Sequence, residues 1–227
     1  MQVVILAAGK GIRMQELTRT IPKPMLEIGG EPLLAHKIRS LPSEISDVVL
    51  IVNYRKEVII DFFGDSYARK KIQYVVQKKL NGTGPSLHAA RSILHDRFMV
   101  MMGDDLYYKK DLQAIMSHEL AVLGYPVDDP TRYGMLSLDK KGCLVDVLEK
   151  PGGKNERYAN TGLYILSQDF FKYNLVQLPN GEYGLPQTIA RMARDYDVAV
   201  VEAIQWFPIE NPDDLKKAEE LLPVFYG

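Results

Sequence analysis

The start of the chain constrains the fold more than any other stretch. Residues 3–7 form a short, continuous apolar run with β-branched side chains, and a loop with two glycines follows at once. Such a run is typical of a strand that is buried on both faces, as in the centre of a parallel sheet. Three cations, Lys10, Arg13 and Lys23, lie in or shortly after the loop. The stretch therefore predicts a parallel sheet with an anion site at the end of its first strand.

Strand-like and helix-like segments alternate through about the first 105 residues. After the first run, the expected strands are residues 47–53, 72–77 and 97–102, and the expected helices are residues 33–41, 58–63 and 86–95. This alternation predicts a parallel sheet that is wound with right-handed crossovers. The fold class that follows is α/β, with a Rossmann-like, mainly parallel sheet flanked by helices.

The second half of the chain has a different pattern, in which strand-like segments are separated by turns. The expected elements are strands at residues 120–127, 134–139, 144–149, 160–166, 198–201 and 204–207, and helices at residues 185–196 and 213–222. This pattern predicts a smaller antiparallel extension on the edge of the first sheet. We expect one domain, residues 1–227, with one lobe at residues 1–110 and a second at residues 111–227.

Composition excludes several classes of partner. The formal net charge of the 227 residues is −1, which gives no electrostatic reason to expect binding to nucleic acid or to a membrane. No apolar run approaches the roughly 20 residues of a membrane span, and the N-terminus lacks the basic region of a signal peptide. A single cysteine, Cys143, allows no intramolecular disulfide and is expected to be structural. We therefore expect a cytoplasmic protein that acts on small molecules.

The glycine loop does not match the two commonest phosphate-binding motifs. A dinucleotide-binding loop has glycine where this chain has Met14, and a Walker loop has serine or threonine where Gly11 follows Lys10. The loop does match L-A-A-G-x-G-x-R-M at residues 6–14, followed by P-K-P-M at residues 22–25. This pair of motifs resembles the sugar-1-phosphate nucleotidyltransferases, which include glucose-1-phosphate thymidylyl- and uridylyltransferases.

The resemblance implies a reaction, a GT-A-like nucleotidyltransferase fold and a set of nucleotide-binding residues. The family joins a nucleoside triphosphate to a sugar 1-phosphate and releases pyrophosphate. Both reacting groups are anionic, so cations that position them and stabilise the leaving group lower the barrier. By resemblance, Arg13 and Lys23 are catalytic. The implied nucleotide-binding residues are Leu6, Ala8, Gly9, Gly11, Arg13, Gln77, Gly82 and Thr83.

The base is expected to be a pyrimidine. In the family, a glutamine at the position of Gln77 contacts the edge of the base. Its amide can donate to O4 or accept from N3–H of uracil or thymine, which indicates UTP or dTTP. The same amide could turn over to suit cytosine, so the choice among pyrimidines stays open.

The resemblance also implies a metal ligand and a sugar-phosphate site. Asp104 lies at the end of the fourth expected strand, where a carboxylate is well placed to hold Mg²⁺. The implied sugar-phosphate residues are Asp105, Gly134, Glu149, Lys150, Asn160 and Gly162. The family forms dimers and tetramers, so the resemblance is compatible with a homo-oligomer.

The chain departs from the family near its end. Where the family has a second metal-binding aspartate, this chain has Pro208, and Glu210 replaces a glycine two residues later. Either Asp104, the phosphates and water hold Mg²⁺ alone, or Glu210 reaches in. Our hypothesis is a site with a single carboxylate.

Two other functions are compatible with these residues. One is a cytidylyltransferase that acts on phosphocholine or another non-sugar phosphate. The other is a regulatory protein that binds a nucleotide sugar without catalysis, and Pro208 favours it. Retention of Arg13, Lys23 and Asp104 argues against the regulatory protein, because a binder has no need to stabilise a leaving group.

Overall fold

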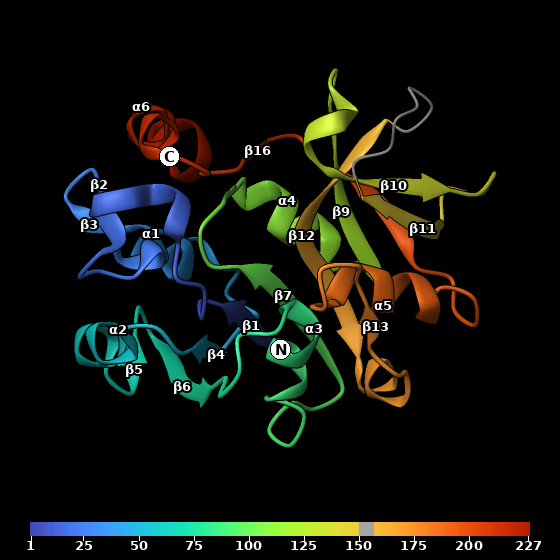
Figure 1. The fold of residues 1–227 in the computed structure, drawn as a ribbon, viewed down its shortest axis with the longest axis horizontal. Helices are drawn as coiled ribbons and strands as arrows, with labels where there is room; N and C mark the ends of the chain where they lie inside the picture. Colours follow the sequence, from blue (N-terminus) through green and yellow to red (C-terminus); the bar gives the residue numbers. More distant parts are fainter. Residues whose placement is uncertain (150–156) are drawn as a thin grey trace.

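A computed structural model of the chain describes residues 1–149 and 157–227. These residues form a ten-stranded mixed sheet with the strand order β11-β10-β12-β7-β1-β4-β6-β5, in which β9 also pairs with β12 and β15 pairs with β9 (Figure 1). The strands are β1 (Gln2–Leu6), β4 (Asp47–Val52), β5 (Ser66–Tyr67), β6 (Lys70–Val76), β7 (Arg97–Met102), β9 (Ala121–Pro126), β10 (Gly134–Leu138), β11 (Leu144–Glu149), β12 (Tyr158–Ser167) and β15 (Ala199–Glu202).

Shorter elements surround this sheet. The helices are α1 (Leu33–Ser40), α2 (Lys56–Phe63), α3 (Thr83–His88), α4 (Lys109–Ile115), α5 (Leu185–Met192) and α6 (Pro212–Tyr226), and the 3-10 turns are η1 (Ile12–Thr18), η2 (Lys23–Met25), η3 (Pro130–Arg132) and η4 (Gln168–Lys172). Three two-stranded ladders pair β2 (Glu27–Ile28) with β3 (Glu31–Pro32), β8 (Leu106–Tyr107) with β16 (Trp206–Phe207), and β13 (Val176–Gln177) with β14 (Tyr183–Gly184).

The first strand is central, as its apolar run predicts. β1 pairs in parallel with β4 on one side and with β7 on the other, and β6 extends the parallel part beyond β4. Alternate residues of β1 enter two different apolar clusters. Val3 and Ile5 pack with α1, α2 and α4, whereas Val4 and Leu6 pack with α3 and α5. Helices therefore cover both faces of the parallel strands, and the α/β prediction is confirmed.

The second half builds the predicted antiparallel extension. β12 pairs antiparallel with β7, β9 and β10, and β11 pairs antiparallel with β10. The register between β12 and β9 shifts between Asn160 and Tyr164, which indicates a bulge there. β12 thus joins the parallel strands to the antiparallel extension (Figure 1).

Some boundaries differ from the prediction. α3 begins at Thr83 instead of residue 86, because Pro85 fits the first turn of a helix, and it ends at His88. α6 runs to Tyr226 through Pro223, although proline usually ends a helix. Phe225 is buried in this last turn, and its burial offsets the lost backbone hydrogen bond. The strand expected at residues 204–207 is reduced to β16.

α6 brings the end of the chain to its beginning. Ala218 and Phe225 of α6 share an apolar cluster with Met14, Leu26 and Ile28. This packing holds the segment before α6 against the loop that follows β1. The candidate site depends on that neighbourhood.

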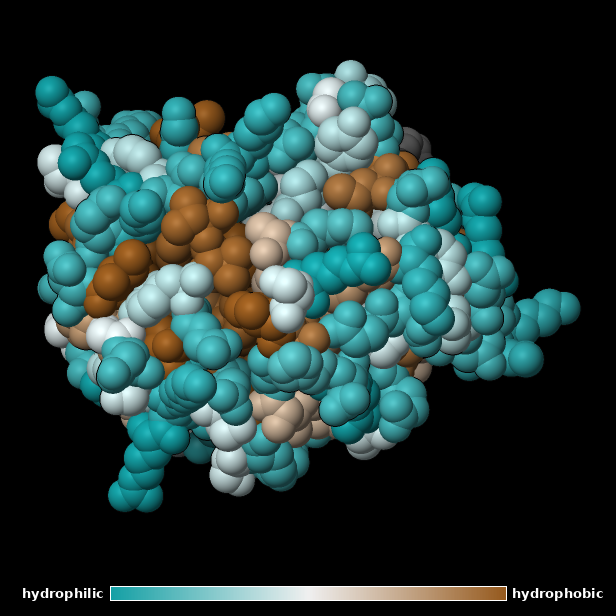
Figure 2. Space-filling view, turned by 90° about the horizontal axis from the view of Figure 1, so that it is seen from below, coloured by the Kyte–Doolittle hydropathy of each residue, from teal (hydrophilic) through white to brown (hydrophobic). Residues whose placement is uncertain are grey.

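The surface is mixed in character. Seen from below, it is mostly hydrophilic, with apolar side chains gathered on the side where α2 and β6 lie in Figure 1 (Figure 2). Phe62 of α2 and Val76 of β6 are among the exposed apolar residues. None of the helices in the described ranges has the length and apolar character needed to cross a membrane.

Candidate active site

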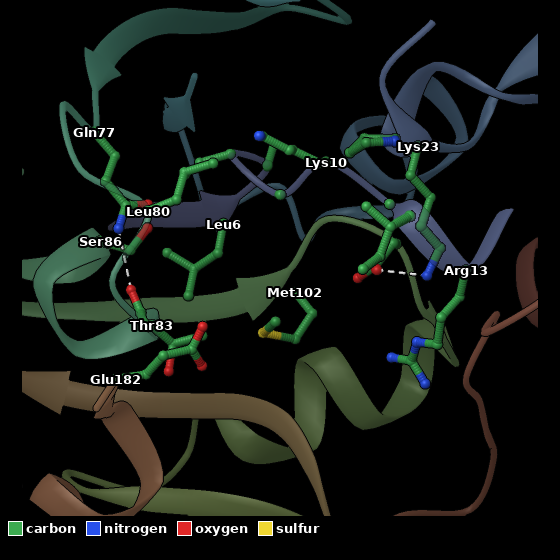
Figure 3. A pocket seen from close by; sticks show the side chains of 18 of the residues that line it. Leu6, Lys10, Arg13, Lys23, Gln77, Leu80, Thr83, Ser86, Met102 and Glu182 are labelled. Atoms are coloured by element: carbon green, nitrogen blue, oxygen red, sulfur yellow. Dashed lines mark hydrogen bonds and ion pairs between the residues drawn. The ribbon is translucent and has the colours of Figure 1, made fainter. Parts of the chain in front are cut away.

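A cavity of about 580 Å³ lies at the carboxyl ends of β1 and β7 (Figure 3). In an open α/β sheet this is where ligands bind. The cavity is lined by the loop after β1, by the segment before α3 and α3 itself, by the end of β7 and by residues around β14. It brings together every residue that the sequence analysis assigns to the nucleotide, metal and leaving group: Leu6, Ala8, Gly9, Gly11, Arg13, Lys23, Gln77, Gly82, Thr83 and Asp104.

Lys23 is a buried cation at one end of the cavity. Its Nζ donates to Asp104 Oδ2 at 2.6 Å, which Figure 3 marks with a dashed line, and also to the carbonyl of Ile209. Only 7% of Lys23 is exposed. A buried ammonium is stable only when it is paired and hydrogen-bonded, and these two contacts satisfy that need. One side chain therefore ties together the η2 turn, the end of β7 and the segment before α6.

Arg13 lies in the same cavity but in a different environment. Its side chain is 69% exposed, and its Nη1 lies 2.5 Å from Glu210 Oε1. The second oxygen of Glu210, Oε2, lies 3.4 Å from Nη2 of Arg132. Figure 3 shows the guanidinium of Arg13 apart from the Lys23–Asp104 contact. The two cations that the sequence analysis predicts to be catalytic thus form ion pairs with different carboxylates, Arg13 with Glu210 and Lys23 with Asp104.

The end of the cavity that contains Gln77 is held by contacts with the backbone. Gln77 is buried just after β6, and its Nε2 donates to the carbonyl of Gly82 at 3.1 Å. Gly82 has φ +118°, and a Cβ there would lie 2.3 Å from the carbonyl oxygen of Tyr183. Only glycine fits this close approach, because no side chain can be accommodated against the backbone. Thr83 Oγ1 accepts from the amide of Leu185, which joins α3 to α5.

None of the predicted sugar-phosphate residues that the structure describes lines this cavity. Gly134 and Glu149 face each other across β10 and β11, and Glu149 Oε1 accepts from Gln187 Nε2 at 2.7 Å. Asn160 exchanges hydrogen bonds with the Tyr164 hydroxyl at the β12 bulge. Lys150 lies outside the described residues.

Gly162 connects this group to the cavity. It has φ +77°, and a Cβ there would lie 2.5 Å from Cγ of Met102, which lines the cavity. Gly162 also donates from its amide to Asn160 Oδ1 at 3.2 Å. The bulge of β12 therefore places Asn160 beside the end of β7.

Asp105 is held by the protein itself. Its Oδ2 accepts from Trp206 Nε1 at 3.2 Å, and its backbone carbonyl accepts from Nζ of the buried Lys37. Burial, reinforced by the charge of Asp104, raises the pKa of the Asp105 carboxyl to about 7. Burial lowers the pKa of the Lys37 ammonium to about 8. These contacts suit a residue that anchors Trp206, and a direct sugar contact by Asp105 stays a prediction.

Sequence reasoning missed three residues with contacts at the site. The only sequence signal for Lys37 is its place among the apolar residues of α1, next to Ile38, where a cation is unusual. Trp206 matches the first residue of the family pattern that contains Pro208, but its contact with Asp105 was not predictable. Arg132 gave no signal beyond its residue type, since its partner lies far away in the chain.

The residues at the cavity fit a hard cation. Two carboxylates, Asp104 and Glu210, line it at the end that holds the lysine and the arginine. Carboxylate oxygens suit Mg²⁺, which takes one or two of them together with phosphate oxygens and water. Within residues 1–149 and 157–227 there is no cluster of three or more His, Cys, Asp or Glu that could hold a metal. Glu210 lining the cavity favours the two-carboxylate alternative over the single-carboxylate hypothesis.

Comparison with known proteins identifies the family. Residues 2–223 match the family described as Nucleotidyl transferase. The chain belongs to the nucleotidyl transferase family. This match confirms the resemblance to the nucleotidyltransferases that was inferred from the loop after β1 and the P-K-P-M motif.

Individual relatives within the family differ in length. The chain is 32% identical over 223 residues to the bifunctional protein GlmU of Methanococcus maripaludis, covering 96% of this chain but 53% of that protein. It is 31% identical over 235 residues to the UTP–glucose-1-phosphate uridylyltransferase AglF of Haloferax volcanii, covering 98% of this chain and 96% of that one. The chain thus spans about half the length of the GlmU relatives that it matches.

A solved structure supports the same fold. A crystal structure from Bacillus anthracis, described as a glucose-1-phosphate thymidylyltransferase in complex with sucrose, superimposes with a TM-score of 0.86. The two chains are 24% identical, and the match covers 98% of this chain and 95% of that one. The ten-stranded sheet is therefore the fold of this family.

Proposed function

We propose that the chain is a sugar-1-phosphate nucleotidyltransferase that joins UTP or dTTP to a sugar 1-phosphate and releases pyrophosphate. The observation that carries this proposal is the single cavity that gathers the glycine loop, Arg13, Lys23 and Asp104. The similarity to AglF, which is named for UTP and glucose 1-phosphate, supports the same assignment.

The reaction is an in-line displacement at the α-phosphorus. A sugar-phosphate oxygen forms a bond to this phosphorus, and the bond from it to the bridging oxygen of pyrophosphate breaks. Negative charge grows on the leaving pyrophosphate, so preorganised cations lower the barrier. Lys23 is already fixed by Asp104 and Ile209. Arg13 is exposed and pairs with Glu210, and once it leaves that carboxylate it can follow the β- and γ-phosphates as they depart together as pyrophosphate.

The base is read at the other end of the cavity. Gln77 is buried, and its amide nitrogen is engaged by the Gly82 carbonyl. One N–H is held there, and the second N–H and the amide oxygen remain for a base. The oxygen can accept from N3–H of uracil or thymine, and it can also accept from the 4-amino group of cytosine. UTP or dTTP is therefore proposed on the similarity to AglF, and the substrate panel decides among the pyrimidines.

Magnesium belongs to the same proposal. Asp104 would hold Mg²⁺, with Glu210 as the second carboxylate in place of the aspartate missing at Pro208. When bound, the ion neutralises phosphate charge and orients the triphosphate. Asn160, Gly162 and Glu149 are proposed to bind the sugar beyond Met102.

A substrate panel tests the proposal. Each of UTP, dTTP, CTP, ATP and GTP is combined with glucose, N-acetylglucosamine or mannose 1-phosphate and Mg²⁺, and pyrophosphate is measured together with the mass of the nucleotide product. We expect release with UTP or dTTP and one of the sugar phosphates, and background without the sugar phosphate. A phosphocholine arm with CTP checks the cytidylyltransferase alternative. If no pair releases pyrophosphate, the catalytic proposal is wrong and the regulatory alternative gains support.

A further inference from the structure

One carboxylate at the cavity is shared by two arginines that come from different halves of the chain. Glu210 Oε1 lies 2.5 Å from Arg13, in the loop after β1, and Oε2 lies 3.4 Å from Arg132, at the end of η3. Each oxygen of the carboxylate therefore has its own guanidinium. In the sequence, Glu210 is only a replacement for a family glycine, and nothing there indicates this arrangement.

The backbone around Glu210 is firmly held. Its amide donates to Asp214 Oδ2 at 2.9 Å, and Asn211 and Asp214 form a capping box that fixes the start of α6. Ile209, the preceding residue, is fully buried and accepts from Lys23. The carboxylate is therefore presented to the cavity from a rigid segment.

Arg132 is also held in place. Asp129 Oδ1 accepts from the amide of Thr131 at 3.0 Å and so caps the η3 turn. The guanidinium of Arg132 lies 5.4 Å above the ring of Tyr133, and this ring meets Trp206 edge-on with its centroid at 5.4 Å. A stacked guanidinium loses less freedom when it forms an ion pair.

The two arginines differ in their access to the cavity. Arg13 and Glu210 line it, whereas Arg132 does not. The ion pair with Glu210 links Arg132 to the described cavity lining. We therefore look for its effect on the site through that carboxylate.

This geometry matters when a triphosphate enters, and here the inference rests on the proposed function. Arg13 must leave Glu210 in order to reach the phosphates. In the absence of metal, Glu210 would then be a lone carboxylate beside a highly charged anion, and like charges at such distances repel strongly. Arg132 stays behind as the counter-ion. We propose that Arg132 is a positioning residue for nucleotide binding, which neutralises Glu210 and thereby releases Arg13 to the triphosphate.

Binding measurements without metal test this role. The affinities of UTP and of inorganic tripolyphosphate are measured by calorimetry in EDTA, so that only protein charges contribute. In the R132Q variant we expect both affinities to fall by about threefold to tenfold, in the range of exposed ion pairs that act in a network. R132K keeps the charge and should recover most of the loss. The difference should shrink as salt rises, because exposed charges are screened.

A double-mutant cycle identifies the partner through which Arg132 acts. In the E210Q background the carboxylate charge is absent, so adding R132Q should change affinity by less than about twofold. The matched control is R157Q. Arg157 forms a more exposed pair with Glu202 at 3.5 Å, away from the cavity lining, and its loss should leave both affinities unchanged.

The outcomes separate this inference from the proposed function. The inference is wrong if R132Q binds both probes as the unmodified protein does, or if R132Q weakens binding equally with and without Glu210. If tripolyphosphate binds and shows the expected cycle but no nucleotide binds, the arginine arrangement stands and the nucleotidyltransferase proposal fails. If neither probe binds the unmodified protein, the inference is overturned.

Discussion

Arg13 and Lys23 are two cations of one cavity that the protein holds in different ways. Lys23 is buried and fixed by two oxygens, whereas Arg13 is mostly in solvent and pairs with one carboxylate. A buried cation is costly to remove, because its partner is left unpaired. An exposed one contributes little to folding. Their replacement should therefore affect stability differently.

For Arg13 we expect loss of function without loss of fold. Arg13→Ala removes the mobile cation from the β- and γ-phosphates, and turnover should fall by at least about 100-fold. The melting temperature should stay within about 2 °C, since the side chain is 69% exposed. Lys10→Ala is the matched control, because Lys10 lines the same cavity and is exposed. Comparable loss in both variants would contradict a special role for Arg13.

For Lys23 we expect loss of both properties. Lys23→Met leaves Asp104 without its 2.6 Å partner, so the free energy of unfolding should fall by about 1–3 kcal/mol. Turnover should fall by at least about 100-fold. Urea titration and pyrophosphate release measure the two effects separately. A variant as stable as the original chain would show that the buried pair contributes nothing to folding.

The residues of the glycine loop could be predicted from the sequence because their motif is local. Gly9, Gly11 and Arg13 lie within five residues, and Met14 at the position of a third glycine excludes the dinucleotide-binding loop. Arg132 could not be predicted, because its contact with Glu210 joins residues 78 positions apart. Only the packing of α6 against the N-terminal segments brings such residues together.

At the level of elements, the β12 bulge depends on one glycine. Gly162→Ala would introduce a Cβ 2.5 Å from Met102 Cγ at φ +77°, and we expect a loss of about 2–3 kcal/mol in the free energy of unfolding. Gly142→Ala is the control, because Gly142 has φ +82° with nothing within 4 Å. The control shares the backbone strain but not the clash, so it should lose only about 1 kcal/mol. Equal losses in thermal or urea unfolding would show that Met102 adapts.

His88, at the end of α3, should make stability depend on pH. Its ring packs edge-on against Phe170 and Phe171, and burial, with the nearby charge of Arg91, lowers the pKa of its imidazole. The unfolded chain then binds more protons than the folded one just below the ordinary pKa of about 6.5. The stability that the neutral His88 imidazole contributes is fully present above a pH of about 6.5. It is lost as the pH falls through the lowered pKa of His88 in the folded state.

Replacing the imidazole tests this dependence. His88→Phe should reduce the difference in melting temperature between about pH 7.5 and about pH 5.5. His95→Gln is the control, because His95 is exposed. If the difference is unchanged in His88→Phe, another group is responsible for the acid sensitivity.

The elements themselves were largely predictable, and their ends were not. The strand predicted at residues 97–102 coincides with β7. A continuous apolar run of this length is typical of a strand that is buried on both faces in the interior of a parallel sheet. The sequence predicts that α6 ends at residue 222, just before Pro223, but the helix continues to Tyr226. Burial of Phe225 outweighs the helix-breaking effect of Pro223. Tertiary burial is not visible in a local pattern.

At the scale of the whole molecule, β12 determines how the two halves are connected. It pairs with β7 on one side and continues into β9 and β10 of the antiparallel extension. The sheet is therefore continuous from β5 to β11. The predicted division at residue 110 falls between two segments that share this sheet.

The position of β7 has a consequence for synthesis of the chain. Phe98, Met99 and Val100 are fully buried, and β7 obtains its second neighbour only when residues 158–167 have been made. Until then a nascent chain presents an apolar strand edge that can pair with another chain. A fragment of residues 1–115 should therefore be recovered mainly in the insoluble fraction, whereas the whole chain stays in the supernatant. A soluble, monomeric fragment would show that the first half folds on its own. The nascent chain would then not need β12 in order to avoid aggregation.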